Sequence, residues 1–181
     1  MTPTHNDFKI LFEGKPDEYF DLYRDEIDEI LAPDEDDDDT GESDDLGDAD
    51  SLDAEELFEI LFTIPIFVDD DYCEMINVLA DEYLPYDIDA DYEDDKLIVH
   101  IDENRHVIDD SEGGYSIVRQ FNEIIKPDFE IRVFKLSLDD YDIHSLIILK
   151  SEVWKELETK YGAKVAAYFA KIDKIDFNDK E

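Results

Sequence analysis

Four carboxylates alternate along one short segment of the chain: Asp87, Asp89, Asp91 and Glu93. Their spacing is typical of the start of a calcium-binding loop, which also requires Gly at its sixth position and a bidentate Glu at its twelfth. Tyr92 and Ile98 occupy those two positions, so the pattern fails twice. We therefore expect only diffuse attraction of divalent ions here and predict no metal site.

The other residues that could do chemistry lack partners at the required spacing. His100 and His106 flank a predicted turn and could meet across a hairpin, but no third ligand for zinc stands near them in the sequence. No serine lies in a nucleophile elbow, and no glycine-rich loop is suited to hold a phosphate. We predict a protein that is not an enzyme and that needs no cofactor.

Acidic residues dominate the composition and are unevenly distributed. The 181 residues include 54 Asp and Glu against 16 Lys and Arg, a net charge of −38. Residues 1–110 hold 40 acids and 5 bases, whereas residues 111–181 hold 14 acids and 11 bases. Between Arg24 and Lys96 the chain has 31 acids in 71 residues and no base. Such a charge repels nucleic acids and anionic membranes, so we expect neither as a direct partner.

Three explanations of this asymmetry compete. Adaptation to high salt would make the whole surface acidic, yet the last 71 residues are nearly balanced. A solubilising loop explains residues 33–53 but not the acids that continue to Asp95. A one-sided acidic face for a basic protein partner explains the whole asymmetry. We place this partner-binding face at twelve residues: Asp36, Asp37, Asp38, Asp39, Asp44, Asp45, Tyr86, Asp87, Asp89, Asp91, Tyr92 and Glu93.

Apolar residues at helical spacing predict three helices in the first half of the chain. The first spans residues 17–31, and its inward side is formed by Phe20, Tyr23, Ile27 and Ile30. Asp53 and Asp71 have the spacing of N-caps for the other two helices, and Glu56 completes a capping box with Asp53. The helix after Asp53 has a predicted apolar stripe of Leu57, Phe58, Leu61 and Phe62. A flexible acidic loop at about residues 33–52 separates the first helix from the second.

The pattern changes from helical to alternating after residue 85. Residues 96–101 and 106–108 are predicted strands of a hairpin, and a helix from Gly113 follows them. Residues 129–133 and 145–149 are predicted strands as well, the second more apolar and therefore interior. A helix capped by Ser151 comes next; Gly162 breaks it, and a last helix carries Val165, Phe169 and Ile172.

This order of elements predicts the fold class. Hairpins joined by short turns favour a mainly antiparallel sheet with helices packed on it, preceded here by an acidic N-terminal helical region. We predict a single α+β domain over residues 1–181.

Nothing in the sequence predicts export or insertion into a membrane. The N-terminal residues lack a basic region followed by an apolar stretch, which a secretory signal would have. The longest apolar run, residues 60–68, is far shorter than the roughly 20 residues of a membrane span. Cys73 is the single cysteine, so no intramolecular disulfide can form. We expect a cytoplasmic protein with no membrane partner and leave its oligomeric state open.

Two features resemble the immunity proteins of bacterial polymorphic toxin systems, which are small, acidic, single-domain α+β chains. They are the base-free interval from Asp25 to Asp95 and the closing amphipathic segment KSEVWKEL at residues 150–157. The resemblance implies a protein that neutralises a basic toxin domain or nuclease. Complementary charge would suit that role because it accelerates association.

The alternative is a nucleic-acid mimic, an inhibitor of anti-restriction or anti-CRISPR type that occupies a DNA- or RNA-binding channel. The stripe Asp17, Asp21, Asp25 and Asp28 offers one carboxylate per helical turn, about every 5.4 Å. A DNA strand carries one charge about every 3.4 Å. Further acidic rows would therefore be needed for mimicry.

Overall fold

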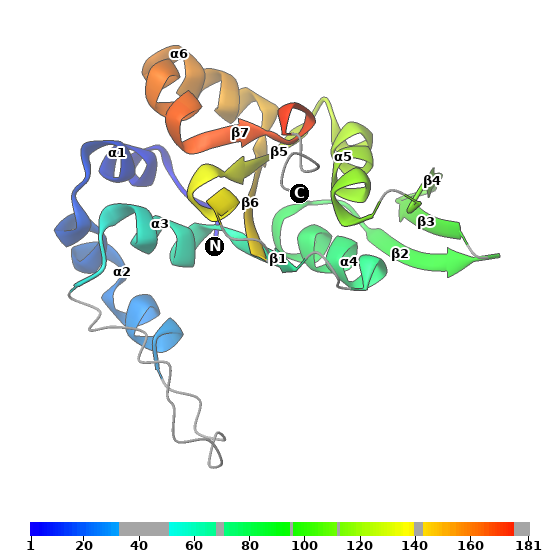
Figure 1. The fold of residues 1–181 in the computed structure, drawn as a ribbon, viewed down its shortest axis with the longest axis horizontal. Helices are drawn as coiled ribbons and strands as arrows, with labels where there is room; N and C mark the ends of the chain where they lie inside the picture. The colour runs from blue at the N-terminus through cyan, green and yellow to red at the C-terminus, as the bar shows by residue number, and fades with distance from the viewer. Residues whose placement is uncertain (33–50, 68–70, 95, 112, 140–142, 176–181) are drawn as a thin grey trace. The chain divides into compact units, whose positions relative to one another are not determined.

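The computed structural model describes residues 1–32, 51–67, 71–94, 96–111, 113–139 and 143–175 (Figure 1). These residues form two compact units, Met1–Thr63 and Ile64–Glu181, and each is described here by itself. The single domain expected from the sequence stays a prediction. So does the acidic loop at about residues 33–52, of which all but the last two residues lie outside the described ranges.

The first unit contains three helices that pack on one another: α1 (His5–Glu13), α2 (Pro16–Ile30) and α3 (Ala54–Phe62). Helix α1 is absent from the sequence prediction, although its start carries a recognisable signal. Thr4 and Asp7 form a capping box, in which each side chain accepts a hydrogen bond from the other's backbone. Gly14, at φ 65° and ψ 50°, ends the helix in the left-handed conformation that glycine adopts readily.

Aromatic rings fill the core of this unit. Phe58 lies 5.4 Å from Phe8 and 5.2 Å from Phe62, measured between ring centroids. Tyr19 is fully buried and lies 6.1 Å from Phe62. Because α1, α2 and α3 each contribute at least one of these rings, the apolar stripes of the three helices stabilise one shared core.

The inward side of α2 differs from the prediction. The helix itself is confirmed, but Tyr19 and Ile27 are its fully buried residues, and Ile30 is 47% exposed. Tyr23 has φ −131° and ψ 29°, which are not helical values. This kink changes which residues face the core, and a regular 3.6-residue period does not anticipate it.

The predicted start of α3 is confirmed. The Asp53 carboxylate accepts hydrogen bonds from the backbone N–H groups of Glu55 (2.8 Å) and Glu56 (3.0 Å). The Glu56 side chain in turn accepts from the Asp53 N–H at 2.8 Å. The predicted apolar stripe is buried as well: Leu57, Phe58, Leu61 and Phe62.

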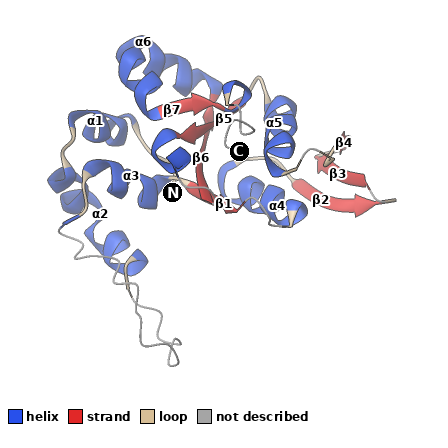
Figure 2. Ribbon diagram, viewed as in Figure 1, coloured by secondary structure: helices blue, strands red, loops and turns tan. Residues whose placement is uncertain are grey.

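The second unit alternates strands and helices along the chain (Figure 2). Its strands are β1 (Ile64–Phe67), β2 (Ile88–Glu93), β3 (Lys96–Ile101), β4 (Asn104–Ile108), β5 (Phe129–Phe134), β6 (Ile143–Lys150) and β7 (Phe169–Lys171). Its α-helices are α4 (Tyr72–Tyr83), α5 (Gly114–Ile125) and α6 (Ser151–Tyr168). Two 3₁₀ helices are η2 (Lys135–Asp139) and η3 (Ile172–Lys174).

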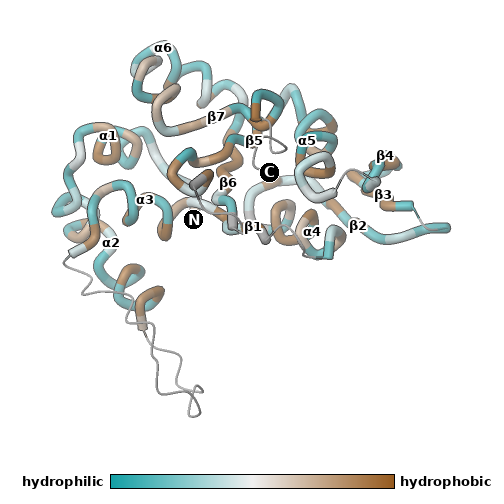
Figure 3. Tube along the Cα trace, viewed as in Figure 1, coloured by the Kyte–Doolittle hydropathy of each residue, from teal (hydrophilic) through white to brown (hydrophobic). Residues whose placement is uncertain are grey.

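These strands form two antiparallel sheets, in the orders β1-β6-β5-β7 and β2-β3-β4. The predicted α+β class is therefore confirmed, and β6 is interior as expected. The chain also repeats a strand–strand–helix order, first as β3-β4-α5 and then as β5-β6-α6. Figure 3 shows most of β6 in the hydrophobic colours and the end of β2 in the hydrophilic ones.

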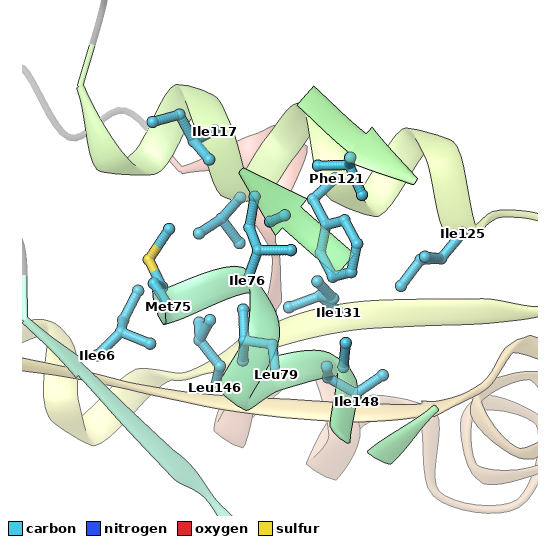
Figure 4. Packing of buried hydrophobic residues seen from close by; sticks show 14 of the residues in the cluster. Ile66, Met75, Ile76, Leu79, Ile117, Phe121, Ile125, Ile131, Leu146 and Ile148 are labelled. Atoms are coloured by element: carbon cyan, nitrogen blue, oxygen red, sulfur yellow. The ribbon is translucent and has the colours of Figure 1, made fainter. Parts of the chain in front are cut away.

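Helices cover both faces of the four-stranded sheet. On one face, side chains of β5 and β6 pack against α4 and α5; Figure 4 shows Ile131, Leu146 and Ile148 among them. On the other face, the Trp154 indole N–H of α6 donates to the Glu130 carbonyl at 2.9 Å. Side chains alternate between faces along a strand, so Arg132 of β5 points to the α6 side, where it stacks on Trp154.

The prediction for the C-terminal helices is only partly right. The predicted break at Gly162 is a kink at Tyr161, at φ −132° and ψ 22°, beyond which α6 continues to Tyr168 and includes Val165. The rest of the predicted last helix is wrong, because Phe169 lies in β7 and Ile172 in η3. Phe169 pairs with Phe134 of β5 in an antiparallel ladder, so tertiary pairing overrides the local helical spacing.

Candidate functional site

The structure locates only part of the predicted partner-binding face. Six of its residues lie outside the described ranges: Asp36, Asp37, Asp38, Asp39, Asp44 and Asp45. The other six lie in the second unit, along or just before strand β2. Their role in binding stays a prediction.

Three carboxylates of β2 share one face of the three-stranded sheet. Asp89, Asp91 and Glu93 are exposed and alternate with the buried residues Ile88 and Ala90. The buried side packs on α4 and α5, so the acidic row faces solvent. Strand β2 is missing from the sequence prediction, although the alternation of its residues was noticed.

Strand pairing places Arg105 and His100 beside this acidic row. Arg105 of β4 donates to one carboxylate oxygen of Glu93, with Nη2 at 3.0 Å and Nε at 3.2 Å. The Nε2 atom of His100 lies 3.2 Å from the other oxygen. These hydrogen bonds, that of Arg105 first, lower the pKa of Glu93 below its ordinary value. The interval from Asp25 to Asp95 contains no base in sequence. The surface formed by its last residues nevertheless includes a base, because Arg105 contacts Glu93.

Tyr86 and Tyr92 do not belong to the acidic row, whereas the exposed Asp87 continues its alternation one position before β2. Asp87 precedes β2, and its carbonyl accepts from the Asp102 N–H at 2.9 Å. Tyr92 belongs to the opposite face of β2, because it alternates with the acids. Its hydroxyl donates to Asp110 at 3.2 Å, and burial, together with this hydrogen bond, raises the pKa of Tyr92 to about 12.

Tyr86 lies in a different place. Its hydroxyl donates to Asp128 at 2.8 Å, which raises the pKa of Tyr86, and its ring meets that of Phe129 edge-on at 5.8 Å. It lines a hollow of about 380 Å³ that also includes Lys150 and Lys155. Tyr86 and Tyr92 are therefore each fixed by a carboxylate and are not neighbouring anchors of one surface.

A second acidic surface lies on α2, in the first unit. This helix holds seven acids and one base, and Asp17, Asp21, Asp25 and Asp28 are all exposed. The Nε atom of Arg24 lies 3.9 Å from the Asp28 carboxylate. Lys15 forms ion pairs with Glu13, before the helix, and with Glu18 in its first turn. Within the described ranges, Asp17, Asp21 and Asp25 form no ion pair. The acidic stripe was visible in the sequence, but we did not assign it to the site.

Two apolar side chains of α2 are exposed as well. Leu22 is 53% exposed, and Ile30, the last residue of the helix, is 47% exposed. Single exposed apolar residues are common on protein surfaces, so exposure by itself assigns these two no role.

A buried ionic cluster is the most constrained polar arrangement of the second unit. Arg132 is 2% exposed, and it donates from Nε to Glu130 at 2.8 Å and from Nη2 to Glu158 at 2.7 Å. Its guanidinium carbon lies 4.1 Å from the centre of the Trp154 ring. Both of these Arg132 nitrogens donate to a carboxylate. The cluster is therefore suited to hold α6 on the sheet rather than to do chemistry.

Other kinds of site find no support in the part of the chain that the structure describes. There, no group of three His, Cys, Asp or Glu side chains is arranged to hold a metal ion. No helix of the described ranges combines the length and apolar character needed to cross a bilayer. Comparison with family models, with curated proteins and with solved structures finds no match to this chain. The resemblance to immunity proteins thus stays a prediction.

Proposed function

We propose that the chain is a non-enzymatic, cytoplasmic binding protein that neutralises a basic protein partner, in the manner of an immunity protein blocking a bacterial toxin. The observation that carries the proposal is the acidic surface of α2. Asp17, Asp21 and Asp25 are exposed there without an ion-pair partner among the described residues.

The spacing of these acids makes their fields add. Four residues of helix rise about 6 Å, which is shorter than the Debye length of about 8 Å at physiological salt. The first unit, residues 1–63, holds 24 acids and 3 bases, so the surroundings reinforce the same sign. A basic partner would be attracted from a distance and oriented before contact.

Leu22 and Ile30 support contact rather than attraction alone. Interfaces with complementary charge usually owe their slow dissociation to desolvated apolar or aromatic anchors near the centre. Both side chains are exposed by about half on the same acidic helix. The proposal assigns them this anchoring role.

The test uses a basic partner sought first among the products of neighbouring genes, and its association with the chain is followed by stopped-flow fluorescence over a range of salt concentrations. Replacing Asp17, Asp21 and Asp25 together by Asn should lower the association rate about tenfold at low salt. The same variant should flatten the salt dependence. Replacing Asp36, Asp37, Asp38 and Asp39 by Asn should act in the same direction.

A matched control separates this surface from net charge. Replacing Glu152, Glu156 and Asp173 by their amides changes the net charge equally, but in the second unit. It should alter the association rate less than about twofold. Equal effects of the two triple variants, or an association rate that salt does not change, would refute steering by α2.

Mimicry of nucleic acid makes a different prediction for the same protein. A mimic should be displaced by duplex DNA and should inhibit several unrelated DNA-binding proteins. Arg105 pairs with Glu93 and so interrupts the acidic row of β2, which weakens its likeness to a phosphate backbone. Competition by DNA would therefore favour mimicry over the function proposed here.

A further inference from the structure

Strand β4 is an edge strand, and the register shows which of its backbone groups point outward. The Asp102 N–H donates to Asp87 O at 2.9 Å, so Asp102 and the alternate residues before it on β3 face β2. The intervening residues Leu97, Val99 and Ile101 face β4, where they pair with Ile108, His106 and Asn104. In an antiparallel ladder, the residues between these pairs direct N–H and C=O away from the partner strand. On β4 those residues are Arg105 and Val107.

Side-chain amides close the neighbouring outward positions. Asn77 of α4 accepts from the Ala90 N–H at 2.8 Å and donates to its carbonyl at 3.3 Å, on the outer edge of β2. Gln120 of α5 does the same for Asp109, just after β4, at 2.9 and 2.6 Å. The amide of α4 thus replaces a further strand at the β2 edge of this sheet, and the amide of α5 does so at the end of the β4 edge.

Arg105 and Val107 have no such substitute. Among the described residues, no hydrogen bond reaches the outward backbone groups of either one. Val107 is also 56% exposed, the most exposed of the large apolar side chains outside the undescribed segments. It lines a hollow of about 290 Å³ together with Lys96, Ile108 and Gln120. An open edge beside an exposed apolar side chain is the arrangement that binds an added strand.

The charge around this edge selects the partner. Lys96 of β3 also lines the hollow beside Val107, but the segment from Asp102 to Asp110 holds four acids against one base. That base, Arg105, already contacts Glu93 at 3.0 Å. A second copy of this chain, added antiparallel at the same edge, would place Asp109 and Asp110 near Asp102 and Glu103 of its neighbour, and like charges at that position are destabilising. A strand carrying Lys or Arg would be attracted.

We infer that the outer edge of β4 receives an extended, basic segment of the partner, which joins the sheet as a fourth strand. Its backbone hydrogen-bonds with Arg105 and Val107, and one of its apolar side chains lies against Val107. The inference rests on the proposed function only for the sign of the partner's charge, because the edge belongs to the second unit and the α2 surface to the first.

The test uses two synthetic hexapeptides with blocked ends, one alternating Lys and Val and the other alternating Glu and Val. Each is added at about 1 mM to the ¹⁵N-labelled full chain, and amide hydrogen exchange is followed by NMR. The Lys peptide should slow exchange at Arg105 and Val107 at least about fivefold, and the Glu peptide should not. Absence of protection at these two amides with the Lys peptide would overturn the inference.

A pair of variants isolates the backbone contribution. Val107→Pro removes an outward N–H that the ladder with β3 does not use, whereas Val107→Thr keeps it. The proline variant should weaken binding of the Lys peptide about tenfold, and the threonine variant less than about threefold. Retained protection of Leu97 and Val99 in the proline variant verifies that the hairpin is intact. Equal binding by both variants would refute strand addition.

The two proposals fail separately. If the Lys peptide protects amides of α2 and leaves β4 unchanged, attraction of a basic partner stands and strand addition at this edge falls. If the α2 variant leaves association unchanged while Arg105 and Val107 are protected, strand addition at β4 stands and attraction by the α2 surface falls.

Discussion

The Asn77 side chain takes the place of a neighbouring strand at Ala90, which gives a quantitative test of how this sheet is ended. Ala90 is 5% exposed, so water does not readily replace the lost partners. Asn77→Ala leaves the Ala90 N–H unsatisfied, at a cost of about 1–3 kcal/mol, and removes the longer hydrogen bond to the Ala90 carbonyl, worth about 0.5 kcal/mol. Alanine returns about 0.5 kcal/mol through its higher helix propensity. We expect a net loss of about 2 kcal/mol in the free energy of unfolding.

Urea unfolding followed by tryptophan fluorescence measures this loss, because Trp154 is the only tryptophan and is buried in the second unit. With a slope of about 1.5 kcal/mol/M, the midpoint should fall by about 1.3 M. Val78→Ala is the control, since Val78 is 46% exposed on the same helix and should cost less than about 0.5 kcal/mol. If Asn77→Ala costs no more than this control, the amide does not substitute for a strand.

Two further predictions concern buried polar groups. Arg132→Met should destabilise the second unit by about 3 kcal/mol, because Glu130 and Glu158 lose a buried partner. Arg105→Met is the control, because it breaks an exposed pair with Glu93. In the same fluorescence assay it should cost less than about 1 kcal/mol. In the first unit, burial and the hydrogen bond to Asp7 raise the pKa of Tyr23 from 10.0 to about 12, so the folded state holds this proton more tightly than the unfolded state. The resulting contribution to the free energy of unfolding is complete below about pH 10 and is lost as the pH rises toward 12. Tyr23→Phe should flatten this part of the curve of stability against pH, measured by circular dichroism in urea. An unchanged curve would contradict the assignment.

Local signals predicted the elements whose ends and periods lie within a few residues. The capping box of Asp53 and Glu56 and the apolar stripe of α3 are examples, as are the hairpin of β3 and β4 and the interior position of β6. The capping box of Thr4 and Asp7 shows that α1 was predictable by the same rule. The α+β class followed from the order of these elements.

Contacts between distant segments decided the rest. Phe169 has the spacing of a helix residue, yet pairing with Phe134 makes it part of a strand. Ile30 is 47% exposed although the period predicts it inward, and a kink at Tyr23 interrupts that period. Neither outcome can be read from a window of neighbouring residues, because long-range pairing and packing compete with local preference.

The charge of this protein divides in the same way. Its sequence alone determined the sign and size of the charge and the 71-residue interval without a base. Tertiary structure decided where that charge is compensated: strand pairing brings Arg105 to Glu93, whereas Asp17, Asp21 and Asp25 form no ion pair within the described ranges. The reason is geometric, since a Coulomb interaction depends on distance in space, and residues twelve apart in sequence can lie at 3 Å when their strands share a sheet.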